Sequence, residues 1–214
     1  MTYFLGQLVE TLPPAAEPVT LEDIKLHLRV SADVDDNAIL QMLAAARQTA
    51  ENYTSLSLIS RNYSLFLDAW PSRHTKEWWD GTREGIVQMA QAREVWLPKP
   101  PLMSVTAVRV YDASGGVTIY PPSSYFVDFR GIPGSLILKD GVAAPQPGQI
   151  ANGIEIQFTA GYGATAATVP APIRQAIRQI VAHMYERRGD DVSAALEKSG
   201  AVSLLQPYRF MSLS

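Results

Sequence analysis

The residues that could act as catalysts or metal ligands are few and widely separated along this chain of 214 residues. The sequence contains no cysteine, which excludes disulfide bonds, thiolate zinc sites and a cysteine nucleophile. Its histidines, His27, His74 and His183, are too far apart for two of them to share one turn of a helix face. A metal site would need ligands from distant segments, so we expect His27 and His183 to be packing or surface residues and expect no metal or cofactor.

Several short motifs begin to match a functional pattern but lack an essential part of it. Asp33–Asn37 has the acids of a calcium loop, but Ala38 and Ala44 stand where such a loop needs a glycine and a glutamate. Thr159–Gly163 is similar to the signature of a potassium-channel selectivity filter, but such a filter needs flanking membrane helices, and the sequence has none. No Gly-x-Ser-x-Gly motif of a serine hydrolase is present. The sequence therefore predicts a helix start at Asp33–Asn37, where negative charge suits the helix dipole, and no enzymatic activity.

Two groups of aromatic and apolar residues could instead contact a partner. Trp78 and Trp79 lie in a polar loop at residues 71–92, where they could stack on a sugar, contact a protein or cover a sheet edge. The C-terminal tail is apolar without a helical period, so it has to be buried on its own domain or on another chain. We favour another chain, because such residue types are enriched at interface centres. The predicted interface residues are Leu204, Leu205, Tyr208, Arg209, Phe210 and Met211.

The composition is typical of a folded protein and excludes several functional classes. Hydrophobic residues make up 47% and charged residues 18% of the chain, which argues against disorder. The net charge of −3 is too mild for a general nucleic-acid binder, which is usually clearly basic. No apolar run reaches the roughly 18 residues of a membrane span, and Met1–Glu10 lacks the pattern of a secretory signal. We therefore expect no membrane partner.

Charge is distributed unevenly along the chain. Residues 1–60 carry three basic and eight acidic residues, whereas residues 170–214 carry six basic and four acidic ones. An acidic front and a mildly basic end could favour contact between copies. The alternative is that solvated faces simply differ in charge without a functional consequence.

The first part of the chain predicts an N-terminal arm followed by two helices. Residues 1–18 contain three prolines and no clear period, so we expect an arm. Thr20 and Asp23 have the spacing of a helix-capping pair and start a predicted helix over 20–29. A long apolar stripe predicts a second helix over 34–53.

The middle of the chain, residues 60–162, predicts an inserted antiparallel β subdomain of about six strands. Alternating apolar residues mark strands at 63–67 and 154–158. Glycine-rich turns around 112–116 and 131–134 predict two hairpins.

Helical periodicity returns near the end of the chain. Prolines in the first turn and an apolar stripe predict a helix over 171–188, and residues 189–214 form the tail segment. The fold class we predict is α+β, in which N- and C-terminal helices form a bundle around the inserted sheet within a domain at 19–188. Removing residues 200–214 is predicted to leave this fold intact.

The order of these stretches resembles the head-to-tail connector (adaptor) proteins of long-tailed bacteriophages and gene-transfer particles. No single motif is specific, but their order and combination match over about 19–188, most of the chain. The matching stretches are Val19–Val30, Asp35–Asn37, Ala44–Arg47, Glu51–Thr54, Leu65–Pro71, Leu97–Val105, Phe158–Gly163 and Val169–Ile177.

The resemblance implies a structural virion protein without catalytic activity. Family members form a twelve-subunit ring beneath the portal, extend the DNA channel, and dock stopper or tail proteins during tail assembly. DNA would pass through the lumen without specific binding, and the protein would be assembled into the particle in the host cytoplasm. The resemblance also implies that the segment at 189–214 grips the portal. The loop at 71–92 departs from the family pattern, and the alternative function is a glycan- or protein-binding β module that uses Trp78 and Trp79.

Overall fold

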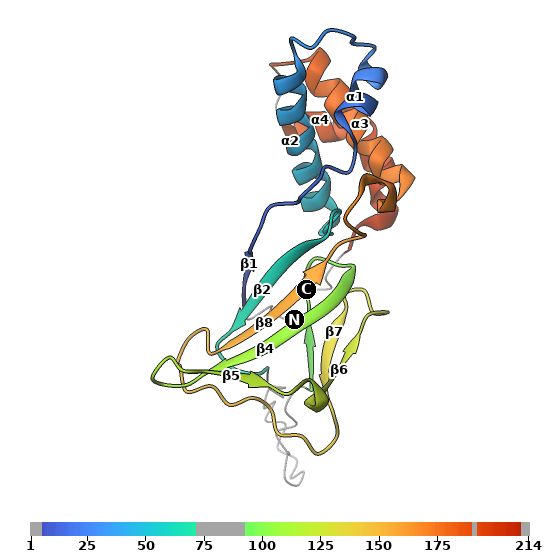
Figure 1. Cartoon of the computed structure of the whole chain (residues 1–214). Helices are drawn as coiled ribbons and strands as arrows, with labels where there is room; N and C mark the ends of the chain where they lie inside the picture. Colours follow the sequence, from blue (N-terminus) through green and yellow to red (C-terminus); the bar gives the residue numbers. More distant parts are fainter. Residues whose placement is uncertain (1–5, 72–92, 190–191, 211–214) are drawn as a thin grey trace, which may run out of the picture. The chain divides into compact units, whose positions relative to one another are not determined.

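The computed structural model describes residues 6–71, 93–189 and 192–210 and shows an α+β protein (Figure 1). The chain divides into two compact units. The β unit takes the described residues of the ranges 1–11, 62–98 and 104–159, and the helical unit those of 12–61, 99–103 and 160–214. Within the described ranges, no helix is both long and apolar enough to span a membrane.

The β unit contains two sheets built from eight strands in the described part of the chain. A five-stranded sheet has the order β1-β2-β8-β4-β5, and a three-stranded sheet has the order β3-β7-β6. The strands are β1 Gly6–Glu10, β2 Arg61–Leu67, β3 Glu94–Trp96, β4 Leu102–Tyr111, β5 Val117–Tyr120, β6 Tyr125–Asp128, β7 Ser135–Leu138 and β8 Ile154–Ala160.

The sheets form because alternate residues of their strands are apolar and are buried on one face. In β2, Tyr63 and Leu65 are buried, and Tyr63 stacks on Phe158 of β8 with ring centroids 5.5 Å apart. Tyr120 of β5 stacks on Tyr125 of β6 at 6.4 Å, which joins the two sheets. Aromatic stacking thus occurs both within the five-stranded sheet and between the two sheets.

Strand β1 corrects the prediction that residues 1–18 are an arm throughout. Gly6–Glu10 pairs antiparallel with β2, and Gly6 lies opposite Leu67 in the register. The sequence did not reveal this strand because it is short, half polar and stabilised by a partner strand far away in the chain.

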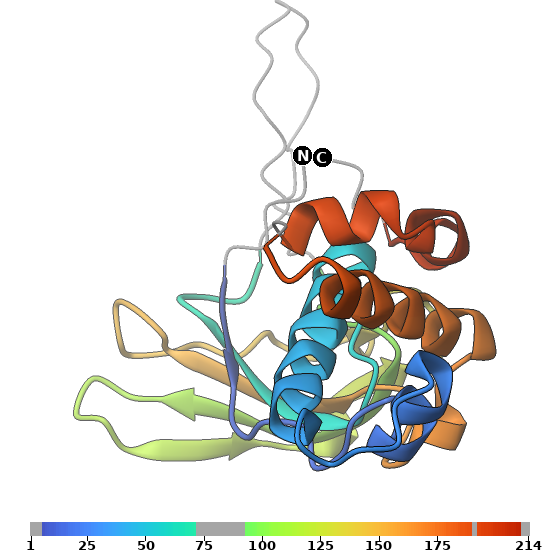
Figure 2. The same cartoon turned by 90° about the horizontal axis from the view of Figure 1, so that it is seen from above.

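The helical unit is a set of packed helices around one core. Its helices are α1 Leu21–Leu28, α2 Asp36–Thr54, α3 Ala171–Glu186, α4 Val192–Lys198 and α5 Ala201–Leu205. α2 packs on α3, and α4 and α5 also contact α3 (Figure 2). The fully buried side chains include Ile39, Leu43, Ile173, Ile177 and Ile180. Burying each such side chain contributes about 1.5–3 kcal/mol.

The start of α1 confirms the predicted capping bond, and α2 starts within Asp33–Asn37 as predicted but without a side-chain capping bond. The Thr20 hydroxyl accepts the Asp23 N–H at 3.1 Å. At α2 the capping residue is Asp35, but its side chain makes no capping bond. Instead, its carboxylate accepts from the Tyr185 hydroxyl at 2.7 Å and from the Arg188 guanidinium at 3.0 Å. The hydrogen bond from Tyr185 and, to a lesser extent, the one from Arg188 hold the pKa of Asp35 below its ordinary value.

The filter-like motif Thr159–Gly163 is explained by a close approach of two backbone segments. Gly161 has a φ of 136°, and a Cβ placed there would lie 2.6 Å from the Ser60 Cα. Its N–H donates to the Pro101 carbonyl at 2.8 Å. Glycine is therefore required at this position by sterics, and no ion-binding role is needed to account for it.

Candidate functional site

A buried ion cluster lies in the helical unit. Arg47 donates to Glu51 at 3.0 Å and to Glu17 at 2.8 Å. Glu51 also accepts from the Arg61 guanidinium and, at 3.0 Å, from the Leu58 N–H. Arg47, Glu51 and Arg61 are all buried. Because every partner is charged or is a backbone donor, this cluster ties α2 to the chain that follows it and has the character of a structural brace.

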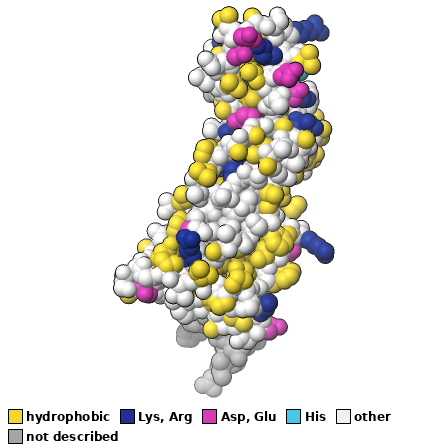
Figure 3. All heavy atoms as spheres, in the orientation of Figure 1, with side chains coloured by type: hydrophobic (Ala, Val, Ile, Leu, Met, Phe, Trp, Pro, Cys, Tyr) yellow, Lys and Arg dark blue, Asp and Glu magenta, His cyan; other side chains and the backbone are white. Residues whose placement is uncertain are grey.

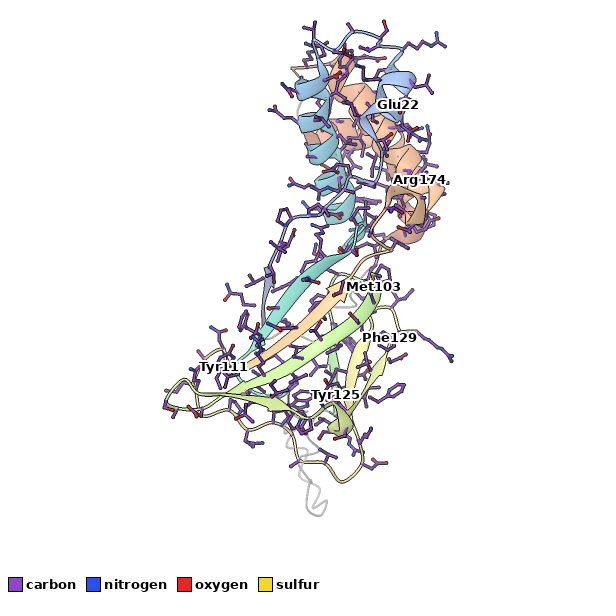
Figure 4. The ribbon with its side chains drawn as sticks, viewed as in Figure 1. Glu22, Met103, Tyr111, Tyr125, Phe129 and Arg174 are labelled. Atoms are coloured by element: carbon purple, nitrogen blue, oxygen red, sulfur yellow. The ribbon has the colours of Figure 1, made fainter. Side chains whose placement is uncertain are left out.

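A second buried polar cluster lies on the five-stranded sheet. Glu155 of β8 accepts from the Ser64 hydroxyl at 2.8 Å, the Tyr111 hydroxyl at 2.7 Å and the Gln157 amide at 2.8 Å. The guanidinium of Arg109 on β4 lies 3.5 Å from the Glu155 carboxylate and is partly exposed. The alternation of β4 and β8 places these side chains on one face of the sheet. Figure 4 marks Tyr111 near one end of this sheet.

The electrostatics of this second cluster favour a structural role. Burial raises the pKa of Glu155, but the hydrogen bonds from Tyr111, Gln157 and Ser64 and the charge of Arg109 outweigh it, so the pKa is lowered. The same carboxylate raises the pKa of Tyr111 through their hydrogen bond. Glu155 is therefore held ionised and Tyr111 protonated, which is the opposite of a proton-transfer pair near neutral pH.

The carboxylates of the acidic stretch Asp33–Asn37 bind neighbouring side chains. Lys25 of α1 donates to Asp33 at 2.6 Å and lies 2.8 Å from Asp36, while Asp35 binds the end of α3. The described residues contain no group of three or more His, Cys, Asp or Glu side chains that could hold a metal ion. The stretch thus fastens α1 and α3 to the start of α2.

The structure places most of the predicted interface residues on their own helical unit. Leu205 is fully buried in the core, and Leu204, Tyr208 and Phe210 pack against it. The Phe210 N–H also donates to the Thr54 carbonyl at 2.9 Å. Leu205 is therefore covered by its own unit, which was the alternative to burial on another chain.

The remaining predicted contact residues have different outcomes. Arg209 is exposed, and its guanidinium carbon lies 5.1 Å from the centre of the Tyr53 ring. Met211, Trp78, Trp79 and His74 lie outside the described residues. Contact of the tail with a portal stays a prediction.

Sequence reasoning did not single out the exposed apolar side chains of the molecule. Leu26 and Val34 are exposed in the helical unit, and an open groove of about 390 Å³ is lined by Leu21, Leu26 and Val30. In the β unit, exposed apolar residues lie on β5 and around the turn after β6: Val117, Ile119, Phe126, Phe129 and Ile132. The alternation of β5 and β6 indicated strands but not which faces stay uncovered.

The visible surface carries no single broad charge field. Figure 3 shows hydrophobic side chains spread over this face, with Lys and Arg and Asp and Glu side chains scattered between them. This distribution agrees with the mild net charge of −3. A mixed surface of this kind suits contact with other proteins more than tight binding to nucleic acid.

Comparison with known proteins finds similarity to a phage connector family and to chains of gene transfer agent particles. The model of the family described as "Phage gp6-like head-tail connector protein" matches residues 18–89. No curated protein gives a significant match. A chain in the neck of an empty gene transfer agent (GTA) particle, computed with C6 symmetry, is 27% identical, with a TM-score of 0.75 and coverage of 97% of both chains.

Two further solved structures agree. A chain in the virion of a native GTA particle is 28% identical with a TM-score of 0.73. A chain in the neck of a native GTA particle, computed with C12 symmetry, is 28% identical with a TM-score of 0.70. Each comparison covers 97% of both chains. The family match over residues 18–89 and these whole-chain similarities together support the identification of this chain as a head–tail connector protein.

Proposed function

We propose that this protein is a structural adaptor at the head–tail junction of a virion or gene-transfer particle. The observation that carries the proposal is similarity over 97% of the chain to proteins in the necks of GTA particles. A passive connector needs no catalytic centre, which suits a chain whose buried carboxylates, Glu51 and Glu155, are engaged in structural contacts.

In this proposal, copies of the chain form a ring beneath the portal. The similar necks were computed with C6 and C12 symmetry, which supports a ring-like arrangement of twelve copies. The ring would extend the DNA channel and offer a docking surface to stopper or tail proteins. A net charge of −3 per chain would let DNA pass without being held, because tight binding depends on cations that neutralise phosphates.

We also propose that the C-terminal segment at residues 189–214 makes the portal contact. Leu205 anchors this segment in the core of its own unit, so its part in the contact is indirect. Arg209 is exposed beside Tyr53 and is available to a partner. The contact would therefore come from the outward side of an anchored segment instead of from a free tail.

The test is to mix the purified protein with its portal and separate the products on a density gradient. We expect the protein to sediment with the portal at one fixed ratio. A stable protein that never sediments with the portal would overturn the proposal. The alternative of a glycan-binding module rests on Trp78 and Trp79, and no observation on the described residues favours it.

A further inference from the structure

The β unit exposes apolar side chains at two separate places. The first is the hairpin end, formed by Asp112, Val117 and Ile119 on β5 and the turn before it. The second is the turn end, formed by Phe129, Arg130 and Ile132 on the turn between β6 and β7. Where such side chains gather in one exposed patch, the patch often marks a site of contact with a partner.

The hairpin end belongs to an edge strand. β5 is the last strand of the five-stranded sheet, and its sequence Val117–Tyr120 contains neither a charge nor a proline. Val117 is 53% exposed and Ile119 is 62% exposed. Edge strands of soluble proteins are protected from pairing by a lysine, a proline, a bulge or a short length, and of these β5 has only its short length, so its exposed apolar side chains favour contact with a partner.

The turn end likewise exposes apolar side chains beside an edge strand, but on the three-stranded sheet. β6 is an edge strand of the three-stranded sheet. Phe129 is 51% exposed and Ile132 is 71% exposed, with the exposed cation Arg130 between them. Phenylalanine and arginine side chains together are typical of interface centres.

The two ends face in different directions within the β unit. The register places Val117 opposite Tyr111, and Figure 4 shows Tyr111 and Phe129 on opposite sides of this unit. A contact between two different surfaces of identical chains is heterologous, and a heterologous contact closes into a ring when its rotation allows. The symmetric necks of the similar GTA chains supply the neighbouring copy.

We propose that the hairpin end of one copy packs against the turn end of the next copy, so that the β units form a continuous belt. This inference rests on the proposed ring. Val117 and Ile119 would pack on Phe129 and Ile132, and the carboxylate of Asp112 would meet the guanidinium of Arg130. The hydrogen bonds that Ser114 and Gly116 donate to Asp112 keep that carboxylate oriented on the turn.

The absence of cysteine allows a direct cross-linking test. The doubly substituted chain Val117→Cys, Phe129→Cys is assembled on the portal, imaged, and treated with a short bis-maleimide linker. We expect a ladder of covalent multimers that extends to the full ring. Each single variant should give no multimers, because each cysteine would face a position without one. The matched control, Val117→Cys with Val34→Cys, uses a residue that is 93% exposed and belongs to the helical unit, outside both ends.

The outcomes separate this inference from the proposed function. A normal ring that gives no ladder would overturn the belt and leave the adaptor proposal standing. Dimers from Val117→Cys alone would show a two-fold contact and would also overturn it. If no ring forms on the portal with the unsubstituted chain, the proposed function fails and the belt fails with it.

A second variant tests the same contact without cysteine. Phe129→Lys should lower ring formation at a given protein concentration at least tenfold, whereas Val34→Lys in the helical unit should leave it unchanged. Circular dichroism of both variants should match that of the parent chain, because both positions are exposed. Equal assembly of the two lysine variants would contradict the inference.

Discussion

The two units of the protein hold their buried carboxylates in different ways. In the helical unit, Glu51 lies between Arg47 and Arg61, and all three side chains are buried. In the β unit, Glu155 accepts from the neutral groups of Ser64, Tyr111 and Gln157, beside a partly exposed Arg109. The charge of Glu51 balances buried cations, whereas Glu155 serves mainly as a hydrogen-bond acceptor. Loss of charge should therefore harm the helical unit more than the β unit.

Deleting residues 200–214 should have the largest effect, confined to the helical unit, which reverses the expectation from sequence that this deletion leaves the fold intact. The deletion removes Leu205 and the contacts of Tyr208 and Phe210 with the core. Losing one buried leucine side chain alone costs about 2–5 kcal/mol. Far-UV circular dichroism should show loss of helix. Deleting 211–214 is the control and should leave the spectrum unchanged, and an intact helical signal in the longer deletion would contradict the core role of the segment.

The charge comparison itself is tested by two matched substitutions. Glu51→Gln should lower the free energy of unfolding by about 3–5 kcal/mol, because Arg47 and Arg61 lose their buried counter-charge. Glu155→Gln should cost about 1–3 kcal/mol, since its donors are neutral and the amide oxygen still accepts. Urea denaturation measures both values. Equal costs, or a larger cost at Glu155, would remove the distinction between the units.

Lowering the pH should lower the stability of the β unit through protonation of Glu155. Its pKa is lower than the ordinary value of 4.5 in the folded chain. A lowered pKa contributes stability above the unfolded value, and this stability is lost as the pH falls through the folded pKa. Between neutral pH and pH values below 4.5, the parent chain should therefore lose more unfolding free energy than Glu155→Gln. Identical acid dependence of the two proteins would show that Glu155 does not contribute.

The smallest effect is expected at the start of α1. Thr20→Ala removes the acceptor of the Asp23 N–H and should lower the free energy of unfolding by about 1 kcal/mol. Thr20→Ser keeps a hydroxyl and should stay close to the parent value. If both variants unfold alike in urea, the cap does not contribute to the stability of the helical unit.

Local patterns were sufficient to predict most of the regular elements of the chain. The spacing of Ile24 and Leu28 indicated α1, and the alternation from Ile154 to Phe158 indicated β8. These signals are local because each element buries one face. The Thr20 cap was predictable for the same reason, since its partner lies three residues away.

Features that depend on distant partners were not predictable. Strand β1 is defined by pairing with β2, and the short helix α5 is held by α3. An isolated helix as short as α5 is unstable in water, so its own sequence gives little signal. The burial of Arg47 and Glu51 was also hidden, because charged residues are usually found at the surface.

The most direct test of the adaptor role is electron cryo-microscopy of the protein bound to its portal. The account predicts a ring of twelve copies beneath the portal, coaxial with the DNA channel, in which both units of this fold fit the density. A portal whose exit side stays bare in the presence of excess protein, or density for a single asymmetric copy, would contradict it.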